Sequence, residues 1–351
     1  MSEQQFQSKE GYGVDDPIIE IRDASVRFDM STGSSKVLDD VNFDIQREEV
    51  IGVVGESGSG KSMFASALLD SVDDPGILTG EITYHPENGD PVDVLSLSES
   101  ELKSVRWEEI AFVVQGAQSG FNPTMKIGDH FLETLRGHDA DVEEGMERAY
   151  QLLEDVYLEP TQILESYAHE LSGGQKQRAL IALGLVLEPE VLVMDEPTSA
   201  LDLLMQRSIV SLLAELQEEY ALTIVFITHD LALVTDIADR IAVMYGFDIV
   251  DVGPSQQILT DSGHPYTRKL LNTVPSIESG NVEMKVIEGS APDPVNVPDG
   301  CNFHPRCPLA DQQCVDIDPE LTASGDDQWS ACHYSERARD EIPLTYLGDD
   351  Q

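Results

Sequence analysis

The chain has 351 residues, enough for one main domain and a smaller appended one. Its 66 acidic and 21 basic residues give a formal net charge of −45 without any Lys/Arg-rich stretch, which argues against a nucleic-acid partner. The 41% of hydrophobic residues fall into periodic segments, so the acidity does not indicate a disordered chain.

Two features of the sequence bear on where the chain resides. No run approaches the roughly 18 consecutive apolar residues of a membrane span, and the polar segment 1–16 lacks the basic and apolar regions of a signal peptide. We therefore expect a disordered leader at 1–16 and a protein that stays in the cytoplasm. The acidic excess favours a halophilic source, because molar salt screens charges beyond about 3 Å.

The first predicted elements are short strands. Residues 18–29 alternate apolar and polar side chains, and a second strand is predicted at 41–46, after a Gly/Ser turn at 31–35. A polar hairpin is predicted at 80–94. These strands predict an antiparallel cap that lies on an α/β core.

A phosphate-binding motif, G-x-x-x-x-G-K-[ST], occupies residues 55–62. An apolar run at 50–54 predicts a buried strand before it, and residues 63–69 predict a helix after it. We expect Lys61 to reach the β- and γ-phosphates and Ser62 to hold Mg²⁺. The alternative is a Gly/Ser turn before an ordinary helix, which the flanking strand and helix disfavour. The motif consists of Gly55, Glu56, Ser57, Gly58, Ser59, Gly60, Lys61 and Ser62.

A further buried strand at 110–114 ends in Gln115. This position is the carboxyl end of a strand, where ligands bind in open α/β sheets, although an ordinary strand-end turn residue is an equal alternative. The acidic, mainly helical region that follows breaks the strand–helix alternation. We therefore predict a helical subdomain, at about 116–170, inserted into the sheet.

The sequence predicts a second helix N-terminus, in addition to the one after the phosphate-binding motif, that could face an anion. Ser172 can cap a helix that runs to about residue 187, and Gly173 and Gly174, before Gln175, would let another surface approach closely. A plain capped helix is the alternative. It explains the serine but not the paired glycines.

Two more strands are predicted to end in polar side chains. The apolar run 191–194 is followed by Asp195, which can orient Mg²⁺, and Glu196, which can polarise a water for attack on the γ-phosphate. A solvated acidic pair is the alternative, against which the apolar run argues. His229 follows the strand at 222–227 and could contact the γ-phosphate, although a lone histidine there is more often structural.

The rest of the core completes one nucleotide domain. Asp202 precedes a helix that is predicted to end near residue 220, and strands at 240–245 and 249–252 complete the sheet. The predicted fold class is α/β: a P-loop NTPase core with a mainly parallel sheet and flanking helices. To this core are added the antiparallel β subdomain, the inserted α-helical subdomain and a small Cys-rich C-terminal extension.

All four cysteines lie beyond residue 300, with the spacing C-x5-C-x6-C-x17-C. In a reducing compartment this clustering favours a metal site over disulfides. The spacing matches neither C-x2-C zinc pairs nor ferredoxin runs, so zinc, an iron–sulfur cluster and buried unligated cysteines all remain open. This proline-rich segment is expected to need the metal in order to fold. The candidate ligands are Cys301, Cys307, Cys314 and Cys332.

The ordered set GESGSGKS, Gln115, LSGGQ, VLVMDE, SALD and His229 resembles the nucleotide-binding domain of ABC transporters. The resemblance implies a head-to-tail pair of domains, with ATP between the phosphate loop of one and the LSGGQ motif of the other. It implies that Phe28 stacks on adenine, Glu196 is the catalytic base and His229 is the switch histidine. Gln115 would link Mg²⁺ to the membrane-facing helical subdomain, and Asp202 of SALD would join the nucleotide site.

Two C-terminal segments, 264–275 and 300–308, resemble the extension of dipeptide/oligopeptide-type importer ATPases. We accordingly divide the chain into an ABC ATPase domain at 17–262 and an extension at 263–351. The resemblance favours a 4Fe-4S cluster over zinc at the cysteines. It also implies two permease subunits, a second ABC ATPase of the same or a related sequence, an extracellular solute-binding protein, and a place on the cytoplasmic face of the membrane.

The function expected from these features is ATP hydrolysis that drives the uptake of dipeptides or oligopeptides. Nickel and oligosaccharides are also carried in this subfamily, and the ATPase subunit does not read the solute. One alternative is a soluble ABC ATPase that acts on ribosomes or DNA, which would need two fused domains or a long coiled coil, together with a basic surface. Another is a regulatory iron–sulfur ATPase, which would need no permease.

Overall fold

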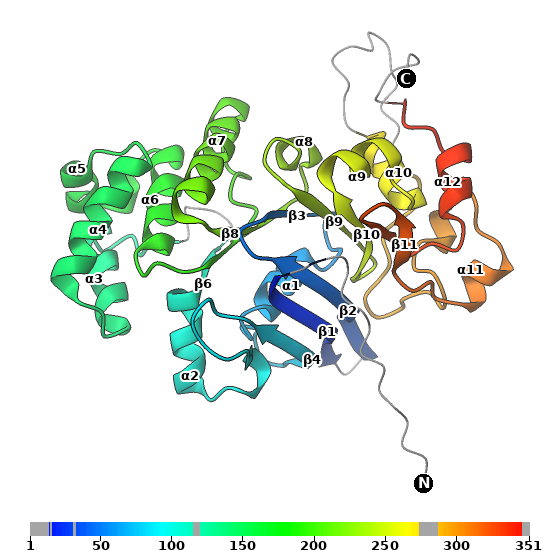
Figure 1. The fold of residues 1–351 in the computed structure, drawn as a ribbon, viewed down its shortest axis with the longest axis horizontal. Coiled ribbons are helices and arrows are strands. Elements are labelled where there is room, and N and C mark those ends of the chain that lie inside the picture. Colours follow the sequence, from blue (N-terminus) through cyan, green and yellow to red (C-terminus); the bar gives the residue numbers. More distant parts are fainter. Residues whose placement is uncertain (1–13, 15, 31–32, 115–119, 274–286, 346–351) are drawn as a thin grey trace.

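The computed structural model describes residues 14, 16–30, 33–114, 120–273 and 287–345, and its strands form two sheets (Figure 1). The strands are β1 (Pro17–Met30), β2 (Gly33–Gln46), β3 (Val50–Val54), β4 (Gly76–Tyr84), β5 (Val92–Asp93), β6 (Ile110–Val113), β7 (Val191–Asp195), β8 (Thr223–Thr228), β9 (Arg240–Tyr245), β10 (Asp248–Pro254), β11 (Thr322–Gly325) and β12 (Gln328–Ser330). The smaller, antiparallel sheet has the order β2-β1-β4-β5. The larger sheet has the order β11-β12-β10-β9-β3-β8-β7-β6 and is parallel from β9 to β6.

The helices surround the larger sheet. They are α1 (Lys61–Ala67), α2 (Glu99–Ser104), α3 (Ile127–Gly137), α4 (Val142–Asp155), α5 (Pro160–Glu165), α6 (Gly173–Leu185), α7 (Leu203–Tyr220), α8 (Leu231–Val234), α9 (Ser255–Asp261), α10 (Pro265–Leu271), α11 (Gln312–Asp316) and α12 (Ser335–Glu341), with shorter helical turns at Val94–Ser96, Val105–Glu109, Ala168–Glu170 and His304–Arg306. Across the described ranges, no helix is both long enough and apolar enough to cross a membrane.

The larger sheet separates two hydrophobic cores. Successive side chains of a strand point to opposite faces, so Val50 and Val54 of β3 join the core beneath the helices, whereas Ile51 and Val53 join the core beneath the smaller sheet. Every residue of β3, β7 and β8 is buried. This explains why these strands are continuous apolar runs in the sequence and not alternating ones.

The predicted helical region forms a group of packed helices. α3, α4 and α5 contact one another, and α4 also contacts α6. Figure 1 shows this group at one end of the molecule, away from α1, which follows β3. The range of the predicted helical subdomain, about 116–170, includes α3, α4 and α5. The predicted hairpin at 80–94 corresponds to β4 and β5, which pair through Tyr84 and Val92.

The C-terminal segment differs from the expectation of a mostly irregular piece that needs a metal to fold. β12 pairs with β10, where Asp251 lies opposite Ser330, and β11 pairs with β12. The segment therefore extends the larger sheet. It also buries Phe303, which is 1% exposed within the main core. Strand pairing and apolar burial thus account for the order of this segment.

Candidate functional site

The phosphate loop connects β3 to α1 and depends on glycine. Gly58 and Gly60 have φ angles of 81° and 106°, a region that side chains disfavour. A Cβ on Gly60 would lie 2.7 Å from the carbonyl oxygen of Val37, so the loop packs tightly against β2. The Lys61 ammonium donates to the carbonyl oxygens of Gly55 at 2.9 Å and Glu56 at 2.8 Å. The lysine is therefore folded back onto its own loop.

The Lys61 ammonium lies in an electrostatically strained setting. Its residue is only 6% exposed, and burial lowers the pKa of Lys61 from its usual value. The carboxylates of Glu196, Asp195 and Glu56 oppose that shift, which shows that all three act on the ammonium. These residues lie on two segments, the phosphate loop with Glu56 and Lys61 and the end of β7 with Asp195 and Glu196, and the fold brings their charges together.

Asp195 ends β7 and offers an oxygen ligand at this site. The residue is 5% exposed; burial raises the pKa of its carboxyl, and a hydrogen bond with Ser62 lowers it in part. Among the described residues, the Oδ1 atom of Asp195 is buried without a hydrogen-bond partner. A buried oxygen of this kind beside a hydroxyl fits the preference of Mg²⁺ for oxygen ligands. Ser62 and Asp195 therefore fit a magnesium site.

Glu196 and His229 meet at the ends of neighbouring strands. β7 and β8 are parallel, and the residues that follow them bring Nδ1 of His229 to 2.9 Å from Oε1 of Glu196. The Glu196 backbone has a φ of 46° and its N–H donates to the carbonyl of Ile227 at 2.9 Å. This backbone hydrogen bond to β8 helps to hold the left-handed conformation of Glu196.

The LSGGQ motif forms the start of α6. The hydroxyl of Ser172 accepts from the N–H of Gln175 at 3.3 Å, and the side chain of Gln175 accepts from the N–H of Ser172 at 2.9 Å. A Cβ on Gly174 would lie 2.2 Å from Cε of Met205, so this glycine permits close packing against α7. Ser172 and Gly173 are exposed, and in Figure 1 their helix lies away from α1 of the same chain.

Three other predicted site residues have different settings. Phe28 lies half-buried on β1, where it packs against the core under the smaller sheet. Asp202 caps α7 by accepting from the N–H groups of Leu204 and Met205, both at 3.1 Å. Gln115 lies outside the described residues.

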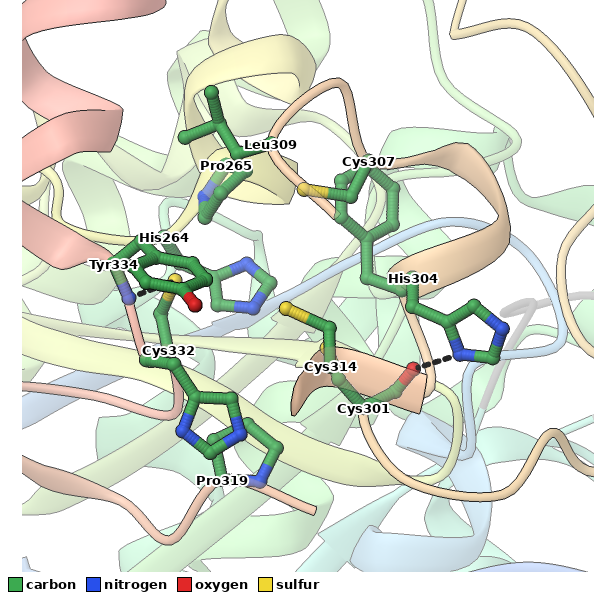
Figure 2. A pocket seen from close by; sticks show the side chains of 12 residues that line it. His264, Pro265, Cys301, His304, Cys307, Leu309, Cys314, Pro319, Cys332 and Tyr334 are labelled. Carbon is green, nitrogen blue, oxygen red and sulfur yellow. Dashed lines mark hydrogen bonds between the residues drawn. The ribbon is translucent and has the colours of Figure 1, made fainter. Parts of the chain in front are cut away.

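The predicted metal site at the cysteines is wrong. All four cysteines line one pocket, with a volume of about 10 Å³, shown in Figure 2. Within the described part of the chain, no group of three or more His, Cys, Asp or Glu side chains is arranged to hold a metal ion. Burial raises the pKa of Cys301 to about 12 and that of Cys332 to about 11.

The sequence patterns also missed residues that contact the phosphate loop from the C-terminal side. The N–H of Glu56 donates to the hydroxyl of Tyr266 at 2.9 Å, and Arg306 forms an ion pair with the Glu56 carboxylate. Both residues belong to segments that were singled out for their resemblance to the importer extension. No local pattern connects them to the loop.

Two family descriptions and several relatives match most of the chain. Residues 38–199 match the family described as "ABC transporter", and residues 250–314 match the "Oligopeptide/dipeptide transporter, C-terminal region". The "Dipeptide transport ATP-binding protein DppD" of Caldanaerobacter subterraneus is 40% identical over 325 residues, which cover 92% of this chain and 98% of the relative. The "Oligopeptide transport ATP-binding protein OppD" of Salmonella typhimurium is 37% identical over 317 residues, or 90% of this chain and 93% of the relative.

Solved structures share the fold of the core. The ATP-binding cassette MJ0796, in a dimeric post-hydrolysis state bound to ADP and Pi, has a TM-score of 0.58 at 27% identity and covers 68% of this chain and 98% of its own. The cbiO1 protein of Clostridium perfringens, part of an ABC transporter complex, has a TM-score of 0.59 at 26% identity, with coverage of 74% and 95%. The expected halophilic source gains no support from these relatives. The relatives and the two matched regions show that the chain belongs to the ABC transporter ATP-binding proteins, in the group that carries the oligopeptide/dipeptide transporter C-terminal region.

Proposed function

We propose that this chain is the ATP-binding subunit of an ABC importer, which hydrolyses ATP to drive the uptake of dipeptides or oligopeptides. The observation that carries hydrolysis is the 2.9 Å contact between Glu196 and His229, within electrostatic reach of Lys61. Peptide as the solute is supported by relatives that are named for dipeptide and oligopeptide transport.

Each polar residue of the site has a role in this proposal. Lys61 binds the β- and γ-phosphates through its ammonium. Ser62 and Asp195 would hold Mg²⁺, which neutralises phosphate charge when it is bound. Glu196 accepts a proton from the attacking water. His229 holds the Glu196 carboxylate in position and is placed to contact the γ-phosphate.

The proposal requires a second ATPase subunit. Ser172 and Gly173 are exposed at the start of α6, and in Figure 1 that helix is separated from α1. A head-to-tail pair would bring the LSGGQ motif of one subunit to the phosphate loop of the other. The dimeric state of MJ0796 with ADP and Pi supports the pairing of two such subunits. In such a pair Phe28 would stack on adenine, and Gln115 and Asp202 would complete the nucleotide contacts.

The remaining partners follow from the importer assignment. Two permease subunits would form the channel, an extracellular solute-binding protein would deliver the peptide, and the chain would sit peripherally on the cytoplasmic face. We assign hydrolysis to 17–262, docking on the permeases to the helical region at about 116–170, and the importer-specific extension to 263–351. A net charge of −45 disfavours attachment to anionic lipid headgroups, so permease contacts would hold the chain at the membrane.

The test is peptide uptake by the assembled transporter. Co-expression with its permeases, reconstitution into vesicles and addition of the solute-binding protein should give ATP-dependent accumulation of a labelled dipeptide. A Glu196→Gln complex of equal assembly should give none. The proposal would be contradicted if the chain did not copurify with the permeases, or if uptake of the dipeptide did not depend on ATP. The alternative of a regulatory iron–sulfur ATPase loses its basis with the metal site.

A further inference from the structure

The C-terminal region reaches the phosphate loop through a two-pronged ion pair. Nη1 of Arg306 lies 2.7 Å from Oε2 of Glu56, and Nη2 lies 3.1 Å from Oε1. The arginine side chain is 5% exposed and the glutamate side chain is 27% exposed. Bidentate pairs of this kind are among the strongest and most directional polar contacts. Shielding from solvent also weakens their screening by salt.

The Arg306 guanidinium is itself held from several sides. Its Nε donates to the carbonyl of Glu288 at 3.0 Å, and its Nη2 donates to the carbonyl of Ile287 at 3.2 Å. The group lies over the rings of Tyr245 and Phe303, 5.6 Å and 6.0 Å from their centroids. Contacts outside the phosphate loop thus hold the Arg306 guanidinium in the orientation in which it pairs with Glu56.

A second contact fixes the backbone of the same loop residue. The hydroxyl of Tyr266, a fully buried residue of α10, accepts from the N–H of Glu56 at 2.9 Å. Tyr266 also packs against Tyr245 and Phe303, with ring centroids 4.4 Å and 5.5 Å away. The side chain and the backbone of Glu56 are therefore both held by residues outside the phosphate loop, Arg306 and Tyr266, which follow β10 in the chain.

The charge of Glu56 bears directly on a polyphosphate ligand. Glu56 is the second residue of the phosphate loop, and its backbone carbonyl accepts a hydrogen bond from the Lys61 ammonium at 2.8 Å. Its carboxylate makes the smallest of three contributions, after Glu196 and Asp195, that oppose the lowering of the Lys61 pKa by burial. An unpaired carboxylate at this position would repel the phosphates that Lys61 must bind. Arg306 supplies the opposite charge at hydrogen-bond distance.

We propose that Arg306 is a positioning residue for ATP, which neutralises Glu56 and fixes the start of the phosphate loop, so that the C-terminal region sets the affinity for nucleotide. This inference rests on the proposed function only in that ATP is the ligand. The role goes beyond stabilising the fold, because it predicts that the charge of Glu56 becomes harmful once Arg306 is removed.

The test compares four full-length proteins for binding of a fluorescent ATP analogue with Mg²⁺, and for thermal unfolding. Arg306→Met should weaken binding about tenfold, the size of effect that coupled charge pairs show. Adding Glu56→Gln to that variant should restore the affinity to within about threefold of the parent, because the uncompensated charge is gone. Arg337→Met is the matched control, since its pair with Glu341 is exposed in the same region, and it should bind as the parent does.

The outcomes separate the possible roles of Arg306. The inference would be overturned if Arg306→Met bound the ATP analogue within twofold of the parent, even if its unfolding temperature fell. It would also be overturned if the single and double variants lost equal affinity. If Arg306→Met does not fold, Arg306→Gln is judged by the same criteria, with and without Glu56→Gln. In steady state the loss should raise the KM for ATP and leave kcat unchanged. Failure of the parent itself to bind ATP would refute the proposed function instead.

Discussion

Replacing Glu196 with glutamine should separate binding of ATP from its hydrolysis. The glutamine has the same size, and its carbonyl oxygen can still meet Nδ1 of His229, which lies 2.9 Å from Oε1 of the glutamate. The variant loses only the negative charge and the ability to accept a proton. General-base catalysis contributes about 10² to 10⁴ in rate, or about 3 to 5 kcal/mol, so turnover should fall by at least two orders of magnitude.

Binding of ATP should not weaken in the same variant. Glu196 is one of three carboxylates that act on Lys61, so removing its charge reduces repulsion of the phosphates. The assay is phosphate release by the assembled transporter, with binding measured separately by a fluorescent analogue. Glu215→Gln is a suitable control, because Glu215 is an exposed residue of α7 whose carboxylate bonds to the Tyr157 hydroxyl. Turnover within tenfold of the parent would refute the assignment of Glu196 as the base.

Three further predictions concern the loop and the C-terminal core. Gly60→Ala should weaken ATP binding more than tenfold, because its Cβ would lie 2.7 Å from the carbonyl oxygen of Val37. Gly58→Ala should cost only about 1 kcal/mol of backbone strain, because no described atom lies within 4 Å of a Cβ there. Similar affinities in titrations of the two variants would contradict this. Burial raises the pKa of Asp251 from 3.8 to about 7, so its contribution to stability is present below 3.8 and is lost as the pH rises towards 7. Asp251→Asn should flatten the pH dependence of urea unfolding over that interval by up to about 4 kcal/mol, and an unchanged slope would exclude this titration. Phe303→Ala should lower the free energy of unfolding by about 3 to 5 kcal/mol in the same assay. Val315→Ala, at an exposed site, should change it by less than about 0.5 kcal/mol. Equal effects would show that Phe303 is not part of the core.

The site residues that could be predicted from the sequence are those that follow the ends of buried strands. The apolar runs that became β3, β7 and β8 are buried on both faces, so their positions and direction can be read from the sequence. Once these strands are parallel neighbours, Lys61, Asp195 and His229 must emerge at the same edge of the sheet. The contact of His229 with Glu196, and the effect of Asp195 and Glu196 on Lys61, follow from that geometry.

Other features lacked a local signal, or had one that was not used. Ser98 and Glu101 form a capping box at the start of α2, a pattern visible in the sequence that was not interpreted as a helix. The contact between Arg306 and Glu56 joins positions 250 residues apart, and no periodicity reports such a pairing. The clustering of cysteines in the sequence does correspond to one shared pocket, in which Cys314 is buried and the other three are partly buried.

The pairing of β12 with β10 has a consequence for any shortened form of the chain. Val250 and its neighbours in β10 use one side to pair with β9 and the other to bond with the segment around Ser330 and Ala331. A chain cut after residue 262 would leave that second side as an open edge with unpaired N–H and C=O groups. Such edges recruit strands from other molecules, so the truncated ATPase core should self-associate and not behave as a smaller soluble domain.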